Sequence, residues 1–297
     1  MTKTSNARFG AGDFMLLLVA AFWGATYLVV KLLGNSGSIP SMMAIRFAMA
    51  AAALWIYWAI RRERITRIEF AFGAIFGVSQ TVVLNLEALS VHYTSATNGG
   101  LIIALAIITV PILESTWNKN WLPPRFFVAT VLAVIGLALL ISGNGLVQPN
   151  MGDLFMLIAV LIRTVHFVVL GQVSKGRSLS PVNLTTIMVT TSALIMTAVG
   201  FDQIAPTARG YSAIDWSLMV FLSVLCTSFA FIGMNWAVKH TSASRTSLLL
   251  GTEPVWATAL AATLGGEAIG ALGVIGAAMI VGATYWGQAI EAKHRLG

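Results

Sequence analysis

The sequence predicts an all-α integral membrane protein with ten transmembrane helices, arranged as two inverted repeats of five helices. The first observation is composition: 57% of the residues are hydrophobic and only 10% are charged, whereas a soluble domain carries roughly 25% charged residues. The second is that long apolar runs fill most of the chain, and roughly 20 apolar residues span a bilayer. The third is an internal repeat, because Thr94-Ser95-Ala96 reappears as Thr241-Ser242-Ala243.

The repeat divides the chain into two halves of similar length. Gly12-Asp13 opens the first half and Gly152-Asp153 opens the second, as expected when one structural unit occurs twice. We therefore expect a first five-helix repeat over residues 1–146 and a second over residues 147–297. Because five is an odd number, the second repeat enters the membrane from the opposite side. Inverted repeats of this kind are typical of secondary transporters, whose substrate site lies near the midplane between the repeats.

The ten expected helices are separated by short loops, several of which are rich in glycine, proline or asparagine. The expected spans are residues 13–32, 40–60, 69–89, 95–117, 124–143, 153–173, 181–201, 214–236, 243–264 and 268–289. Their apolar runs are continuous, whereas the strands of a membrane β-barrel alternate with a period of two residues. The sequence therefore favours helices over a barrel.

Lysine and arginine residues predict the orientation of the chain. With the N-terminus inside, 14 of the 18 lie in segments that face the cytoplasm, a bias that indicates orientation under the positive-inside rule. They are Lys3, Arg8, Arg61, Arg62, Arg64, Arg67, Lys119, Arg125, Lys175, Arg177, Lys239, Arg245, Lys293 and Arg295. We expect a multi-pass protein of the bacterial inner (plasma) membrane with both termini cytoplasmic. The net charge of +7 then reflects topology and indicates no nucleic-acid partner.

Two charged residues lie at the middle of predicted helices. Arg163 is central in the span 153–173 and Glu253 is central in the span 243–264, a depth at which charges are rare and usually face the bundle interior. In the functional interpretation, Arg163 receives a substrate carboxylate, while Glu253 faces an ammonium group or exchanges a proton. In the structural interpretation, the two form an ion pair that locks their helices, because a buried pair is costly to break from one side.

His166 lies one turn from Arg163 and shares its helix face. Its titration range suits a proton shuttle, and a hydrogen-bonded packing histidine is the alternative. No other histidine, cysteine or acidic residue has metal-ligand spacing with it, so we expect neither a metal ion nor a cofactor.

Aromatic and polar residues of the first repeat are the remaining candidates for substrate contacts. Trp23 and Tyr27 are four residues apart on the first helix, and Ser79 and Gln80 lie at the midpoint of the third. Aromatic side chains beside an amide suit a pocket for an amphipathic metabolite with an apolar side chain. Tryptophan and tyrosine also anchor helices at the membrane interface, but Trp23 lies too deep in its helix for that role.

Several short motifs resemble the EamA-type, ten-helix branch of the drug/metabolite transporter superfamily. Besides the repeated Thr-Ser-Ala stretch, they are Trp23-Gly24, Arg46-Phe47, Glu253-Pro254 and Gly266-Glu267. The resemblance covers nearly the whole chain and implies export of amino acids, aromatic ones among them, and of related metabolites. It also implies a central cavity that rocking of the repeats exposes to either side in turn.

A secondary transporter is the first functional interpretation, and a passive facilitator or channel without coupling residues is the alternative. The sequence has no His-Glu-x-x-His, no Gly-x-Ser-x-Gly and no P-loop, so an intramembrane enzyme is less favoured and ATP hydrolysis is not expected. The expected partners are a small-molecule substrate and the lipid bilayer, with proton coupling through His166 or Glu253. The glycine-rich last helix is a surface on which a second copy of the chain would pack if the protein is an oligomer.

Overall fold

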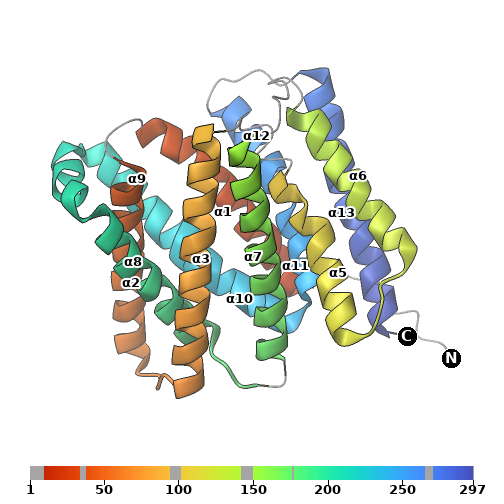
Figure 1. Cartoon of the computed structure of the whole chain (residues 1–297), viewed down its shortest axis with the longest axis horizontal. Helices are drawn as coiled ribbons and strands as arrows, with labels where there is room; N and C mark the ends of the chain where they lie inside the picture. Colours follow the sequence, from red (N-terminus) through yellow and green to blue (C-terminus); the bar gives the residue numbers. More distant parts are fainter. Residues whose placement is uncertain are drawn as a thin grey trace.

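The computed structural model describes residues 10–33, 38–93, 102–141, 150–175, 177–264 and 270–296, almost all of which are helical. The helices are α1 (Ala11–Leu33), α2 (Ile39–Arg61), α3 (Arg67–Tyr93), α5 (Ala106–Asn118), α6 (Pro124–Ile141), α7 (Met151–Ser174), α8 (Pro181–Gly210), α9 (Ala213–Ser223), the π-helix η2 (Val224–Phe229), α10 (Ala230–His240), α11 (Ala243–Leu250), α12 (Glu253–Thr263) and α13 (Ala271–Leu296). Figure 1 shows the longer helices running side by side as a bundle.

Eight helical segments of the described chain are long and apolar enough to cross a membrane. They coincide with eight of the expected spans, although the one expected at 181–201 continues to Gly210 as α8. The expected span 95–117 appears in part, as the shorter apolar helix Ile102–Asn118, while Thr94-Ser95-Ala96 and Gly266-Glu267 lie outside the described residues. The prediction of an all-helical membrane protein is confirmed.

The expected span 243–264 is not one continuous helix. α11 ends at Leu250, Gly251 and Thr252 form a turn, and α12 begins at Glu253. Pro254 explains the interruption, because proline lacks a backbone N–H and is tolerated in the first turn of a helix but not in its interior. The prediction of one continuous helix over residues 243–264 was therefore wrong.

The fourth span is interrupted at the equivalent point. α5 begins at Ala106 after a turn at Leu105, and Ala106 and Glu253 are 147 residues apart, like the two Thr-Ser-Ala stretches. The two interruptions lie side by side, since a Cβ atom added to Gly251 would be 2.5 Å from Cδ1 of Ile107. Interrupted helices at matching positions of two repeats are a strong indication of where a transporter binds its substrate.

The two repeats pack against each other through long helices. α2 and α3 both lie along α8, and α3 also lies along α7. Gly73 and Gly77 let α3 approach α8 closely, because a Cβ atom at Gly77 would be 2.6 Å from the carbonyl oxygen of Met188. The main buried apolar cluster includes Phe76 and Leu170 and draws on helices of both repeats. This packing holds α3 beside α7, where the site described next is found.

Candidate functional site

Four ionisable side chains from four helices meet within the membrane-spanning bundle. They are Tyr27 of α1, Glu87 of α3, Arg163 of α7 and Glu253 of α12. The guanidinium and the two carboxylates lie within electrostatic reach of one another, and the tyrosine interacts with all three. We call these four residues the mid-membrane cluster.

Arg163 forms an ion pair with Glu87. Nη2 of Arg163 donates a hydrogen bond to Oε1 of Glu87. Their side chains are 24% and 23% exposed, so the pair is not sealed inside the protein. Among the described residues this is the only hydrogen bond that the guanidinium donates, although an arginine has five N–H donors in a planar fork. Arg163 therefore keeps donors for a second acceptor.

Glu253 joins the cluster from the first turn of α12. Its carboxylate lies beside the Tyr27 hydroxyl and within electrostatic reach of Arg163. Gly24 makes this contact possible, since a Cβ atom there would be 2.9 Å from the carbonyl oxygen of Glu253, so that α1 touches α12. Tyr27 follows one turn later on the same face. Arg163 and Glu253 thus share one cluster, with Glu87 as the direct partner of the arginine.

Protein atoms cover the cluster only in part. Tyr27 is 63% exposed, although it interacts with groups on α3, α7 and α12, and Glu253 is only half-buried. With two carboxylates and one guanidinium, the cluster carries a charge of −1 when both carboxylates are ionised.

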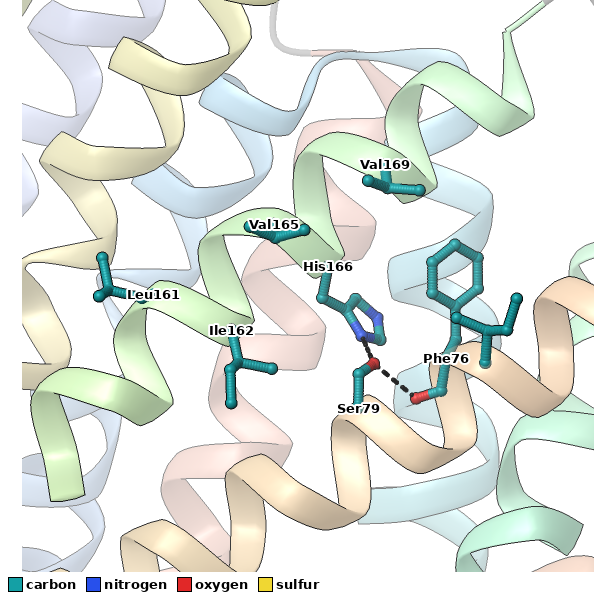
Figure 2. A pocket seen from close by; sticks show the side chains of 8 residues that line it. Phe76, Ser79, Leu161, Ile162, Val165, His166 and Val169 are labelled. Carbon is teal, nitrogen blue, oxygen red and sulfur yellow. Dashed lines mark hydrogen bonds between the residues drawn. The ribbon is translucent and has the colours of Figure 1, made fainter.

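His166 makes its polar contact elsewhere. Its Nδ1 lies 2.7 Å from Oγ of Ser79, its ring packs on Phe76 with centroids 4.9 Å apart, and the residue is 5% exposed. Figure 2 shows this contact beside a pocket of about 330 Å³ between α3 and α7. The rest of the pocket is lined by Ile75, Leu161, Ile162, Val165 and Val169. The structure thus joins His166 to Ser79 in an apolar setting, not to the carboxylates of the cluster.

Trp23 ties α1 to the π-helix η2. Its Nε1 donates to the carbonyl oxygen of Cys226 at 3.1 Å, and its ring packs edge-on against Phe231 with centroids 5.6 Å apart. The buried Arg46 of α2 donates to Thr227 of the same π-helix at 2.7 Å. π-helices are rare and frequently occur at functional sites, but the contacts of Trp23 and Arg46 here are bonds between helices.

The structure brings together three of the residues that the sequence indicated, namely Tyr27, Arg163 and Glu253. Gln80 is half-buried and lies two turns from Glu87 on the same face of α3. Sequence analysis missed Glu87. The signal that would have found it is an acidic residue within an apolar span, where a charge is costly and usually functional. Its position near the end of the expected span 69–89 made that signal weak.

A second charged cluster lies at the face of the bundle where α1 begins and α13 ends. Arg245 donates from Nε and Nη2 to Asp13 at 2.5 and 2.6 Å, and from Nη1 to Glu291 at 3.2 Å. Ser242, the N-cap of α11, donates to Glu291 and accepts from the backbone N–H of Arg245. The exposed fractions of Arg245, Asp13 and Glu291 are 13%, 2% and 2%. We call these three charged residues the terminus-face cluster.

Glu114 of α5 adds to the contacts at this face. Its carboxylate accepts from the backbone N–H groups of Ala243 at 3.3 Å and Ser244 at 2.7 Å, and Lys175 at the end of α7 is 3.4 Å away. A carboxylate at a helix N-terminus satisfies N–H groups that have no partner within the helix. The ends of α1, α5, α7, α11 and α13 are thereby held together at this face.

The mid-membrane cluster presents charged groups and hydrogen-bonding groups to a ligand. No group of three histidine, cysteine, aspartate or glutamate side chains suited to a metal ion occurs in the part of the chain that the structure describes. The single cysteine, Cys226, is buried. The mid-membrane cluster can bind an ammonium group, bind a carboxylate, or take up and release a proton.

Comparisons with known proteins agree with this architecture. The model of the EamA-like transporter family matches residues 10–142 and again residues 150–286. An uncharacterized transporter of Bacillus subtilis, YyaM, is 24% identical over 282 residues, which cover 90% of each chain. An uncharacterized transporter of Archaeoglobus fulgidus is 24% identical over 245 residues, which cover 82% of this chain and 75% of that protein.

A solved structure gives independent support for the fold. One crystal structure superposes with a TM-score of 0.77 over 93% of this chain and 98% of that chain, at 14% sequence identity. At that identity the likeness concerns the fold alone. The family match, in contrast, covers both repeats and agrees with the resemblance seen in the sequence motifs. The chain belongs to the EamA-like transporter family.

Proposed function

We propose that the protein is a secondary transporter that exports amino acids, including aromatic and other neutral ones, and related small metabolites. The observation that carries the proposal is the mid-membrane cluster beside the two interrupted helices. An amino acid presents a carboxylate and an ammonium group, which complement the guanidinium of Arg163 and the carboxylate of Glu253. Family membership supports transport, and the substrate class rests on this complementarity.

Each residue of the cluster has a role in this proposal. Arg163 binds the substrate carboxylate, since a guanidinium fork matches a carboxylate in two-point geometry. Glu253 faces the substrate ammonium or carries a proton when no substrate is bound. Tyr27 orients Glu253 through its hydroxyl and offers an exposed aromatic face to an apolar side chain. Gln80, two turns from Glu87 on α3, and Trp23, one turn from Tyr27 on α1, are the proposed contacts for the rest of the substrate.

Alternating access is supported by the charged contacts at one end of the bundle. The terminus-face cluster and Glu114 hold five helix ends together at one face. Opening toward that face requires these bonds to break, while rocking of the repeats leaves the central cluster in place. The positive-inside distribution of lysine and arginine supports a bacterial inner-membrane location with the termini, and hence this face, in the cytoplasm.

Counterflow in proteoliposomes tests the proposal. Vesicles containing the purified protein are loaded with unlabelled amino acids, and uptake of labelled phenylalanine, methionine and threonine is followed with and without a pH gradient. We expect uptake that distinguishes among the three and depends on the protein. Protein that is folded and active toward another ligand, yet shows no amino-acid counterflow, would disprove the substrate class.

The same assay separates a coupled transporter from a passive facilitator. In a facilitator, a pH gradient leaves the steady-state distribution of a neutral zwitterion unchanged. In a proton-coupled transporter, the gradient drives accumulation against the substrate gradient. Accumulation that collapses with a protonophore supports coupling through Glu253, and its absence favours the facilitator.

A further inference from the structure

We propose that Glu87 is a built-in competitor of the substrate: its carboxylate occupies the place on Arg163 that a substrate carboxylate takes, and this competition selects zwitterionic substrates. The inference rests on the proposed function, because it assumes that carboxylated ligands enter the mid-membrane cluster. It adds a specificity determinant on α3 that neither the family match nor the sequence motifs indicate.

The geometry of the Arg163–Glu87 contact suits an exchangeable partner. A single hydrogen bond joins Nη2 to Oε1, and the two side chains are 24% and 23% exposed. Arg245 of the terminus-face cluster instead uses Nε, Nη1 and Nη2 and is only 13% exposed. A one-point, partly exposed contact leaves donors on Arg163 through which an incoming carboxylate can bind before Glu87 departs.

Charge balance makes the exchange selective. A simple carboxylate that reaches Arg163 adds a third anion to Glu87 and Glu253, with one guanidinium to balance them. An excess carboxylate within the membrane interior is costly. A zwitterion brings its own ammonium group, which Glu253 neutralises, so that the total charge of the cluster does not change. Glu87 thereby penalises anions that carry no ammonium group.

A matched set of ligands tests the competition. Phenylalanine, 3-phenylpropionate and phenethylamine share one aromatic group. Phenylalanine carries both charged groups, 3-phenylpropionate carries only the carboxylate, and phenethylamine carries only the ammonium group. Their dissociation constants are measured by calorimetry on purified protein. For Glu87→Gln, which removes the competing charge and keeps the shape, we expect phenylalanine to bind about fivefold or more tightly, within the usual range of coupling between two ligands. We also expect 3-phenylpropionate to gain measurable binding, while phenethylamine does not bind more tightly.

Three companion variants show where the effect arises. Glu63→Gln replaces a carboxylate in the loop after α2, where Glu63 pairs with Arg61, and leaves the three affinities unchanged. Arg163→Gln combined with Glu87→Gln removes the gain for both carboxylated ligands, because no guanidinium remains to be released. Glu87→Asp keeps the charge but shortens the side chain, and changes the affinities in the same direction as Glu87→Gln by a smaller factor.

The opposite results overturn the inference. If Glu87→Gln weakens phenylalanine and 3-phenylpropionate together, Glu87 positions Arg163 and does not compete with the substrate. If Glu87→Gln leaves the affinities for phenylalanine and 3-phenylpropionate unchanged, Glu87 does not compete with the substrate either. If Glu87→Gln does not fold, the Glu87→Asp affinities decide, and equal or weaker binding of phenylalanine rejects competition. If the folded wild type binds no phenylalanine, the proposed substrate class fails. The gain of 3-phenylpropionate binding by Glu87→Gln then still tests the competition separately.

Discussion

Two clusters in this molecule have the same charged composition and different surroundings. Each contains one arginine and two carboxylates. They are Arg245 with Asp13 and Glu291 at the terminus face, and Arg163 with Glu87 and Glu253 in the middle of the bundle. All three nitrogens of the Arg245 guanidinium are bonded, and its two carboxylates are each 2% exposed. Arg163 donates one hydrogen bond among the described residues, to a carboxylate that is 23% exposed.

The difference shows how the same ionic groups serve structure in one place and binding in another. A buried charge is tolerated when hydrogen bonds satisfy it, and a fully bonded cluster has little to offer a ligand. The terminus-face cluster therefore holds helices together. A cluster with spare donors and exposed surface is instead suited to exchange its partners for those of a ligand.

The largest effect on stability is expected from Arg245→Ala. The substitution leaves Asp13 and Glu291 buried without their cation, and breaking a buried ion pair from one side costs about 3–5 kcal/mol. Thermal unfolding in detergent, followed by size-exclusion chromatography, measures the loss. Arg209→Ala, at the exposed end of α8, is the control and should unfold like the wild type. An Arg245→Ala protein of normal stability would show that the terminus-face cluster does not stabilise the helix bundle.

Arg163→Ala is expected to affect transport more than stability. The substitution removes the guanidinium that binds the substrate carboxylate, and losing one partner of such a bound charge pair commonly costs about 2–5 kcal/mol, so we expect counterflow of carboxylated substrates to fall by about a hundredfold. The loss of stability should be smaller than for Arg245→Ala, because Glu87 is partly exposed and remains hydrated. Counterflow and thermal unfolding are measured on one preparation. Normal counterflow, or unfolding as severe as that of Arg245→Ala, would contradict the distinction.

The sequence predicts the membrane spans well because each depends on about 20 consecutive residues, whose summed hydropathy outweighs local detail. It does not predict which charges meet. Arg163 and Glu253 are visible as charges at mid-span, but their partners depend on the rotation of α3 and α1 within the bundle. Only the close approach at Gly24 brings Tyr27 to Glu253. The same limit hides the pairing of Glu87 with Arg163, which are 76 residues apart.

Glu253→Gln sharpens the comparison by removing the excess carboxylate of the mid-membrane cluster. Glutamine keeps the shape and an acceptor oxygen beside Tyr27, but it cannot bind or release a proton. We expect counterflow at equal pH to continue at a rate reduced by roughly tenfold, because losing a hydrogen bond to a charged group costs about 1.5 kcal/mol or more. The response to a pH gradient should disappear. Glu63→Gln serves as the control and should keep both the wild-type counterflow rate and the response to a pH gradient. A Glu253→Gln protein that still accumulates substrate in response to the gradient would assign the coupling to another residue.

The smallest effect on transport is expected from His166→Phe, which tests where the mid-membrane cluster ends. Phenylalanine keeps the aromatic contact with Phe76 but loses the hydrogen bond to Ser79, so we expect about 1 kcal/mol lower stability. Counterflow should stay within about twofold of the wild type, because His166 bonds to Ser79 beside an apolar pocket and not to the carboxylates. Stability is measured by thermal unfolding, and transport is measured by counterflow with labelled phenylalanine. A decrease in counterflow as large as that of Arg163→Ala would place His166 on the substrate path and extend the exchangeable cluster along α7 by a full turn.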